Sequence, residues 1–317
     1  MNNTKALPVG VVLMSFGSPA TLEDVPAYMA SVRGGRPAAG ELVTEFQRRY
    51  RVVGGSPLIR ITLEQASALE VSLNAEAGKK GSYRVVVGMR HAPPLISEAL
   101  TKLASEGIKR VIAIILSPQY SPIIMGGYHR AVEEASSVLG PYATVRVAGA
   151  WHQLPSFLDA LAQRVSEALD RFSPQEREEV PVLLTAHSLP KSVVDREPGH
   201  IDQLKETAIA VAKRVGLSPD RWWFAYQSAG HTSEEWLKPD LKDLFPSLKA
   251  AGHPRVLVVP IQFLADHLEI LYDIDIAARD EAEAVGLDLV RIESFNAMPE
   301  FIRALADVVH REMALQV

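Results

Sequence analysis

The sequence contains no cysteine in its 317 residues. This absence excludes disulfide bonds, thiolate zinc sites, cysteine-ligated iron–sulfur clusters and a thiol nucleophile. Any metal chemistry must therefore use histidine, carboxylate, tyrosine or methionine side chains. The lack of disulfides also fits the reducing cytoplasm, where we expect the protein to act.

Long hydrophobic runs are absent as well. The chain is 47% hydrophobic, yet no apolar run approaches the roughly 18 residues of a membrane span. Lys5 and the apolar stretch 6–16 are similar to a signal peptide, but Pro8 and Gly10 interrupt this stretch. We therefore expect a buried first strand there, no transmembrane segment and a cytoplasmic protein.

The excess of charge is small, with 33 basic and 38 acidic side chains and a net charge of −5. Such a balance gives no general attraction for nucleic acid or anionic lipid, and we expect no nucleic-acid partner. An anionic ligand would need a local basic site. Arg33 with Arg36 and the run 48–51 could be ordinary surface charge, or could bind a carboxylate-bearing ligand through bidentate arginine contacts.

Short runs rich in Val, Ile and Leu alternate with longer amphipathic stretches, which is typical of parallel strands joined by crossover helices. The pattern predicts strands at Val9–Phe16, Tyr83–Met89, Val111–Ser117, Thr144–Ala150, Val180–Ala186, Trp222–Gln227, Val256–Gln262 and Asp288–Glu293. It predicts helices at Val25–Arg33, Thr62–Glu76, Pro94–Ser105, Tyr128–Val138, Leu154–Phe172, Pro198–Val215, Leu268–Ala284 and Pro299–Leu315. The predicted fold class is α/β with doubly wound parallel sheets.

The chain also shows a faint internal similarity. Residues 110–120 resemble residues 255–263, and 11–16 resemble 182–187. We therefore predict two Rossmann-like halves, an N-terminal half over 1–150 and a C-terminal half over 151–317. A closing C-terminal helix in the second half is free to pack back on the first. The chain length suits two such halves.

His187 directly follows a predicted buried strand, and ligands of open parallel sheets bind beyond the carboxyl ends of the strands. A lone histidine is more often structural than catalytic, but this position gives the two roles similar weight. A serine hydrolase is an alternative interpretation, because Ser188 is adjacent to His187. The Gly-x-Ser-x-Gly elbow is absent, however, and adjacent residues leaving a strand point to opposite sides.

Three glycine pairs, at 34–35, 54–55 and 126–127, match neither the dinucleotide fingerprint nor the Walker A pattern. Nucleotide binding therefore has no positive support. Tight turns, or a close approach of the backbone to a flat ligand, would explain these pairs.

The segment 265–275 combines carboxylates with many apolar residues. If it is an α-helix, Asp266, Glu269 and Asp273 share one face. An acidic stripe is usually a solvated face, but little of this segment is suited to bulk water. We therefore predict a cation route, or a proton-transfer group whose pKa is raised by the apolar surroundings.

Six motifs together resemble the ferrochelatase family, in the same order and from about Val9 to the last helix. They are Met14–Pro19, Gly54–Leu58, Ser117–Ser121, Thr185–Pro190, Tyr226–Ser228 with Glu235–Asp240, and Asp266–Asp275. Through Ser31–Pro37 and Ile123–Arg130 the chain is most similar to the cluster-free bacterial coproporphyrin III ferrochelatases. The resemblance implies a chelatase-like fold with two Rossmann-like halves around a porphyrin cleft. It also implies insertion of Fe(II) into coproporphyrin III, giving coprohaem, in haem biosynthesis.

The resemblance also implies roles for individual residues. His187 and Glu269 would be the catalytic pair that coordinates ferrous iron and accepts pyrrole protons, and Asp273 would continue an acidic path for the metal. The substrate contacts would be Phe16, Arg33, Arg49, Tyr50, Ser56 and Tyr128. Two positions depart from relatives. Phe16 is Tyr in many of them, where the phenol oxygen can ligate iron, and Ala277 is Glu in some.

The resemblance makes iron a substrate and a porphyrin the ligand, with no permanent cofactor. Many ferrochelatases carry a C-terminal cysteine-ligated cluster. This chain has no cysteine and ends at Ala314–Val317, so no iron–sulfur cluster is expected. We expect a monomer, with other haem-pathway enzymes as candidate partners. Three alternatives stay open: a protoporphyrin IX ferrochelatase, a chelatase for another metal or tetrapyrrole, and a non-catalytic tetrapyrrole carrier. The presence of both His187 and Glu269 argues against the carrier.

Overall fold

The computed structural model describes residues 8–78, 81–230 and 234–315, and these form two compact units. Unit 1 comprises the described residues within Met1–Leu116, Ile124–Trp151 and Asn296–Val317. Unit 2 comprises those within Ser117–Ile123 and His152–Phe295. The C-terminal helix α12 (Pro299–Ala314) therefore belongs to unit 1, and a short segment near residue 120 to unit 2. Of the residues discussed above, Lys5, Ala6, Gln316 and Val317 lie outside the described residues.

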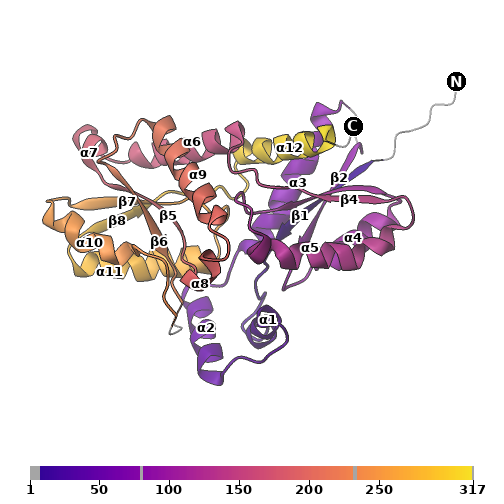
Figure 1. Ribbon diagram of the computed structural model, residues 1–317, viewed down its shortest axis with the longest axis horizontal. Helices are drawn as coiled ribbons and strands as arrows, with labels where there is room; N and C mark the ends of the chain where they lie inside the picture. The colour runs from indigo at the N-terminus through magenta and orange to yellow at the C-terminus, as the bar shows by residue number, and fades with distance from the viewer. Residues whose placement is uncertain (1–7, 79–80, 231–233, 316–317) are drawn as a thin grey trace. The chain divides into compact units, whose positions relative to one another are not determined.

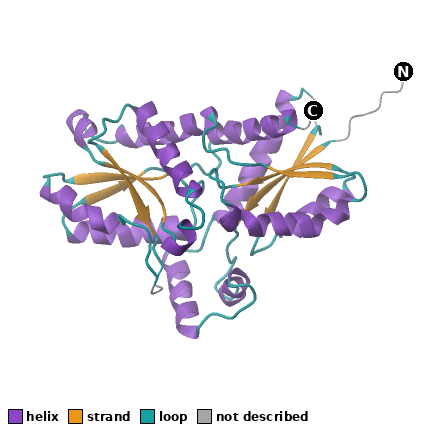
Figure 2. Ribbon diagram, viewed as in Figure 1, coloured by secondary structure: helices purple, strands orange, loops and turns teal. Residues whose placement is uncertain are grey.

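Unit 1 is built on a parallel sheet with the strand order β2-β1-β3-β4. The strands are β1 (Val9–Ser15), β2 (Tyr83–Met89), β3 (Arg110–Ile115) and β4 (Thr144–Val147). Helices cover both faces of this sheet (Figure 2). The helices of unit 1 are α1 (Val25–Val32), α2 (Gly40–Val52), α3 (Leu58–Glu76), α4 (Ile96–Ser105), α5 (Pro122–Ser136), the short 3-10 helix η1 (Ser137–Leu139), and α12. In Figure 1, α1 and α2 lie apart from the layers that cover the sheet.

Unit 2 repeats this plan with the strand order β6-β5-β7-β8, again all parallel. The strands are β5 (Val182–His187), β6 (Trp222–Gln227), β7 (Arg255–Pro260) and β8 (Asp288–Arg291). The helices are α6 (Pro155–Leu169), α7 (Pro174–Glu179), α8 (Lys191–Val194), α9 (Gly199–Val215), α10 (Leu241–Ala250), the π-helix η2 (Glu269–Ala278) and α11 (Arg279–Ala284). Here too, helices lie on both sides of the sheet (Figure 1).

The two sheets also share their register. Val11 of β1 lies opposite Ile112 of β3, and Val182 of β5 lies opposite Leu257 of β7. These are the residues that the internal similarity of the sequence aligns with one another. The similarity therefore reflects two copies of one supersecondary arrangement, and the carboxyl ends of β1 and β5 are equivalent positions.

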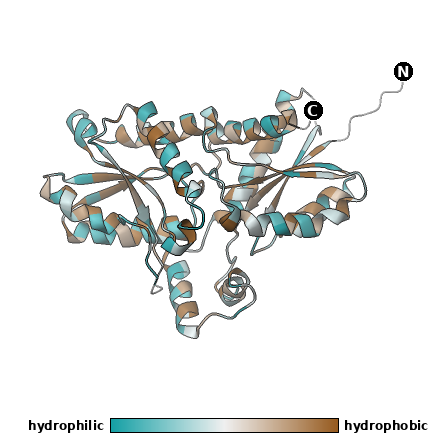
Figure 3. Ribbon diagram, in the orientation of Figure 1, coloured by the Kyte–Doolittle hydropathy of each residue, from teal (hydrophilic) through white to brown (hydrophobic). Residues whose placement is uncertain are grey.

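The apolar runs of the inner strands β1, β3, β5 and β7 form strands because helices cover both of their faces. Every residue of β1 is buried, as are most residues of β3, β5 and β7, and the strands are largely brown in Figure 3. All eight predicted strands are confirmed, with ends that differ by up to three residues. The α/β fold with parallel sheets is thereby confirmed.

Four helices were missing from the sequence prediction: α2, α7, α8 and α10. Only Tyr50 of the 13 residues of α2 is buried, so no apolar stripe marks this helix. The helices α7 and α8 are short, and α10 contains Pro246, which normally indicates a helix end. Within the described part of the chain, no helix combines the length and the apolar character needed to cross a membrane.

Candidate active site

His187 and Glu269 come together at the carboxyl end of the unit 2 sheet. His187 is the last residue of β5, and Glu269 is the first residue of η2. The distance from His187 Nε2 to Glu269 Oε2 is 3.9 Å, and the two side chains are 28% and 42% exposed. The pair is thus open to a ligand while it is still close enough for strong electrostatic coupling.

The hydrogen bonds of His187 indicate which ring nitrogen carries the proton. Its Nδ1 lies within hydrogen-bond distance of the Ser188 carbonyl oxygen, which can only accept. The neutral ring therefore has its proton on Nδ1, which leaves the lone pair of Nε2 directed to the side of Glu269. The backbone N–H of His187 donates to Gln262 Oε1 at 3.1 Å and fixes the end of the strand. His187 can accordingly accept a proton or bind a metal ion through Nε2.

His267 is a third member of this group and was not singled out by the sequence. Its Nε2 lies 3.6 Å from Glu269 Oε2, and its Nδ1 donates to the Ala265 carbonyl oxygen at 2.9 Å. The Phe263 ring lies between the two imidazoles, with centroid distances of 6.3 Å to His187 and 4.5 Å to His267. Two signals in the sequence pointed to His267, namely its position after β7 and its place inside the motif Asp266–Asp275.

The expectation of a raised carboxylate pKa in this segment is wrong for Glu269. Burial raises the pKa of Glu269, but His187 and the hydrogen-bonded His267 outweigh it and lower the pKa to about 2. Conversely, burial lowers the pKa of His267, and the contact with Glu269 raises it above its ordinary value. Apolar neighbours alone would have produced the opposite shift at Glu269, so the two histidines decide the charge of this carboxylate.

The acidic stripe predicted for an α-helix is also only partly correct. Asp266 lies before the helix, where it accepts from Ser294 Oγ at 2.7 Å and lies 3.5 Å from Arg291. The segment from Glu269 to Ala278 is a π-helix, whose hydrogen bonds span five residues. Its wider turn keeps Glu269 and Asp273, four residues apart, on one side. Asp273 is half-buried and continues the row that Glu269 begins.

The described residues contain no group of three His, Asp or Glu side chains arranged to hold a metal ion by themselves. His187 and Glu269 by themselves offer two ligand side chains, and a site with few protein ligands lets a bound metal ion exchange ligands readily.

In unit 1, Phe16 follows β1 and is 39% exposed. Its ring packs at 4.5 Å from the His91 ring and at 6.5 Å, edge to face, from the Tyr28 ring. Gly17, with a φ of 89°, turns the chain immediately after Phe16. His91 Nδ1 is 3.0 Å from Ser31 Oγ. Burial, followed by the charge of Arg90, lowers the pKa of His91 to about 4, so this ring is neutral at pH 7.

The helices α1 and α2 carry three of the residues assigned by resemblance. Arg33 is exposed at the C-terminal end of α1. Arg49 is 20% exposed and pairs with Glu45 at 2.9 Å, as does Arg48 at 2.8 Å. Hydrogen bonds from Arg48 and then Arg49 lower the pKa of Glu45 to about 2. Two arginines share one carboxylate, so the cluster keeps a net positive charge. Tyr50 is buried, with 5% of its surface exposed.

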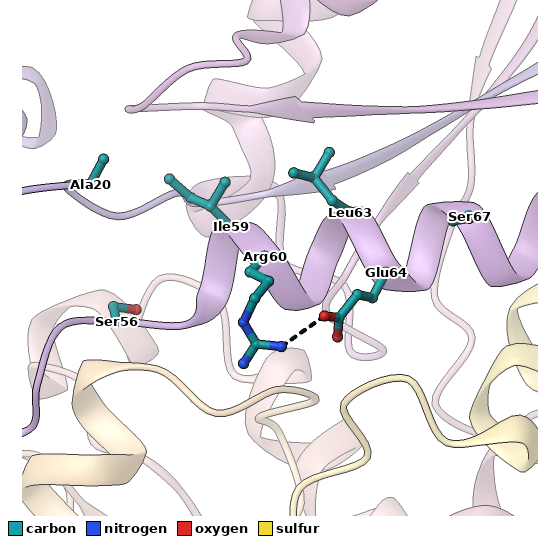
Figure 4. A pocket seen from close by; sticks show the side chains of 7 residues that line it. All are labelled: Ala20, Ser56, Ile59, Arg60, Leu63, Glu64 and Ser67. Atoms are coloured by element: carbon teal, nitrogen blue, oxygen red, sulfur yellow. Dashed lines mark hydrogen bonds and ion pairs between the residues drawn. The ribbon is translucent and has the colours of Figure 1, made fainter.

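Ser56 lines a groove of about 530 Å³ in unit 1. Figure 4 shows this groove and its other lining residues, Ala20, Ile59, Arg60, Leu63, Glu64 and Ser67. Arg60 and Glu64 form an ion pair at 2.7 Å, which neutralises both charges. The groove is thus mainly apolar and lies beside the turn that precedes α3.

Tyr128 of α5 is almost fully buried, with 6% of its surface exposed. Burial raises the pKa of its phenol, against the opposing charge of Arg90, so the hydroxyl stays protonated. The Arg90 guanidinium lies 5.7 Å from the Tyr128 ring centroid and 6.0 Å from that of Phe16. The Arg90 guanidinium therefore lies near the rings of both Phe16 and Tyr128. The resemblance implies substrate contacts for these two residues and assigned no role to Arg90.

The fold, with a histidine–carboxylate pair at the end of a strand, defines a chelatase. A solved structure of SirB from Bacillus subtilis with Fe3+ matches 96% of this chain and 95% of its own chain, with a TM-score of 0.58. The two sequences are 11% identical, so this likeness concerns the fold alone.

The chain belongs to the ferrochelatase family. The family model described as ferrochelatase matches residues 8–313. A ferrochelatase from Deinococcus radiodurans is 37% identical over 98% of both chains. A coproporphyrin III ferrochelatase from Geobacillus sp. strain WCH70 is 36% identical over 97% of this chain and 98% of its own. The protein is therefore a porphyrin metal chelatase, a lyase that takes Fe(II) as a substrate in haem biosynthesis.

Proposed function

We propose that the protein inserts Fe(II) into coproporphyrin III and forms coprohaem in the cytoplasm. The observation that carries the chemistry is the approach of His187 Nε2 to within 3.9 Å of Glu269 at the end of β5. The choice of porphyrin is supported by the relative named coproporphyrin III ferrochelatase, by the excess of positive charge on α2 and by Arg33 at the end of α1.

Metal insertion requires the loss of two pyrrole N–H protons and the exposure of nitrogen lone pairs. His187 accepts a proton at Nε2, because its Nδ1–H is held by the Ser188 carbonyl. The nearby Glu269 carboxylate stabilises the imidazolium that results. Since the pKa of Glu269 is about 2, this group stays ionised, and its charge favours protonation of His187. His187, which is 28% exposed, releases the first proton to water and then accepts the second.

The same two side chains hold the incoming ferrous ion. His187 and Glu269 supply two ligands, and Asp273 lies one turn further along the row on η2. Four porphyrin nitrogens then replace the remaining water and protein ligands. The small number of protein ligands lowers the barrier to this exchange.

Unit 1 supplies the contacts to the substrate. Arg33, Arg49, Tyr50, Ser56 and Tyr128 bind the propionates and the ring edge. The Phe16 ring packs on the macrocycle but offers no oxygen to iron. On that face the product iron therefore takes water or another side chain as its ligand.

Steady-state iron insertion with coproporphyrin III and protoporphyrin IX at equal concentration tests the proposal. We expect a higher kcat/KM for coproporphyrin III. Arg33→Gln should lower its affinity, whereas Arg303→Gln, which removes an exposed arginine paired with Glu300 on α12, should not. A preference for protoporphyrin IX overturns the substrate. Binding of porphyrin without any insertion favours the carrier alternative instead.

A further inference from the structure

Arg90 follows β2 directly, at the carboxyl end of the unit 1 sheet. Its backbone N–H donates to the Ser15 carbonyl oxygen at 3.0 Å, which extends the pairing of β1 and β2 by one residue. The side chain is half-buried, and its guanidinium lies near both the Phe16 ring and the Tyr128 ring. Stacking on aromatic rings holds a guanidinium in a defined plane.

Gly127 of α5 provides the space for this guanidinium. A Cβ atom at this position would lie 2.0 Å from Arg90 Cζ, 2.1 Å from Nη2 and 2.4 Å from Nε. The neighbouring Gly126 differs, because its nearest contact would be Arg130 Nη1 at 3.5 Å. A glycine inside a helix lowers helix stability relative to alanine. At residue 127 the absence of a side chain lowers helix stability but leaves the space that the Arg90 guanidinium occupies.

The charge of Arg90 has no carboxylate neighbour. Among the ion pairs and hydrogen bonds of the described residues, its side chain contacts no Asp or Glu. Arg49 pairs with Glu45, and Arg291 pairs with Asp275 at 2.7 Å. A half-buried cation is costly without an anion, and the adjacent His91 and Tyr128 are both neutral at pH 7 because burial shifts each pKa away from neutrality. A carboxylate of a ligand can supply this anion.

We propose that Arg90 binds a propionate carboxylate of the porphyrin and thereby favours coproporphyrin III over protoporphyrin IX. This inference rests on the proposed function. Coproporphyrin III carries propionates at two ring positions where protoporphyrin IX has vinyl groups. A planar guanidinium binds a carboxylate through two parallel hydrogen bonds, whereas a vinyl group leaves it without a partner. Arg90 lies beside Phe16, whose exposed ring is available to the macrocycle.

Four variants test this role: Arg90→Gln, Arg90→Lys, Gly127→Ala and the matched control Gly126→Ala. Equilibrium binding of metal-free coproporphyrin III and protoporphyrin IX is measured by quenching of porphyrin fluorescence, and iron insertion is measured separately. Arg90→Gln should weaken coproporphyrin III binding about 10- to 100-fold, as expected for the loss of a charge-assisted pair. Protoporphyrin IX binding should change little.

Gly127→Ala should reproduce the effect of Arg90→Gln, because the new methyl group displaces the guanidinium while alanine favours the helix. Arg90→Lys should retain part of the affinity, since a lysine keeps the charge without the planar fork. Gly126→Ala should behave as the unmodified protein does. Thermal unfolding shows whether each variant is folded.

Equal losses for both porphyrins in Arg90→Gln would overturn the inference, because they would mean that Arg90 only supports the Phe16 and Tyr128 rings. Unchanged binding of both porphyrins would overturn it as well. Failure of the unmodified protein to insert iron into either porphyrin would instead contradict the proposed function. The binding measurement, which needs no metal, would still report on Arg90 in that case.

Discussion

Phe16 and His187 occupy equivalent positions in the two units. Each lies five residues beyond the matched pair Val11 and Val182, which have the same register against the third strand of their own sheet. Phe16 packs against neutral aromatic and imidazole rings, whereas His187 faces a carboxylate. The same backbone position thus presents an apolar surface in one unit and a proton acceptor in the other. The fold supplies the position, and the side chain decides the chemistry.

The helices that follow the third strands differ in the same way. In unit 1, β3 leads to the α-helix α5, which carries Gly127 and Tyr128. In unit 2, β7 leads to the π-helix η2, which carries Glu269 and Asp273. One helix leaves room for an arginine, and the other sets carboxylates in a row. Under the proposed function, unit 1 recognises substrate carboxylates and unit 2 handles the metal and the protons.

The largest effect should come from His187→Ala. Loss of the base should lower kcat for iron insertion by about 10² to 10⁴-fold, while porphyrin binding is largely retained. Phe16→Ala at the equivalent position should act mainly on porphyrin affinity. Insertion rates and fluorescence titrations of both variants compare the two positions directly. Unchanged turnover in His187→Ala would show that His187 is not the base. The two equivalent positions would then not differ in catalytic role.

Glu269→Gln should follow, with a loss of about 100-fold in kcat. The pKa of His267 should fall at the same time, because burial lowers it and Glu269 is the strongest of the groups that raise it, ahead of the Ala265 carbonyl and Asp266. NMR titration of the histidine rings measures this shift. Glu235→Gln, in an exposed pair with Lys191, is the control and should leave both quantities unchanged. A His267 that titrates identically in Glu269→Gln would disprove the coupling.

Phe16→Tyr should have a moderate effect. It gives residue 16 an oxygen that can ligate iron, so that unit 1, like unit 2, offers an iron ligand at the equivalent position. When ferric coprohaem is added to the variant, the added phenol oxygen should ligate its iron and give a phenolate-to-iron charge-transfer band that the unmodified protein lacks. Product release should also become slower. Visible absorption spectra of the ferric coprohaem complex provide the measurement. Spectra identical to those of the unmodified protein would show that residue 16 does not face the iron.

The smallest effect concerns His91 and the stability of unit 1. Its pKa is lowered to about 4 in the folded chain, from an ordinary value of 6.5. Between these values the unfolded chain binds more protons, so His91 makes stability fall as the pH falls from about 6.5 to about 4. His91→Gln should remove this contribution. Urea unfolding at pH 7 and pH 5 measures it, and an undiminished pH dependence in the variant would contradict the assignment.

The strands could be predicted from the sequence because parallel strands buried on both faces are nearly continuous in hydrophobicity. His187 and Glu269 were predicted from their positions after buried strands and from family motifs, and the structure brings them within 3.9 Å. The internal similarity predicted two similar halves, and in the structure the aligned residues Val11 and Val182 are paired in the same way. These are features in which local sequence and tertiary position coincide.

Other features depend on contacts that a one-dimensional pattern does not contain. The low pKa of Glu269 requires His267 and His187, which come from different segments. Asp266 lies outside the predicted acidic stripe, because Arg291 and Ser294, from a later part of the chain, bind its carboxylate. The relation of Gly127 to Arg90 spans two elements of unit 1. A glycine pair in the sequence indicates only that side chains are missing, not which group takes their place.

The spacing of residues on η2 has an evolutionary consequence. Ile270, Ile274 and Ala278, four residues apart, are buried and anchor the helix. Glu269, Asp273 and Ala277 each precede one of these residues and are only partly buried. Single substitutions at Ala277 or Asp273 can therefore lengthen or shorten the row of carboxylates without changing the buried residues. Under the proposed function, selection can adjust the path of iron in this way separately from the base at His187.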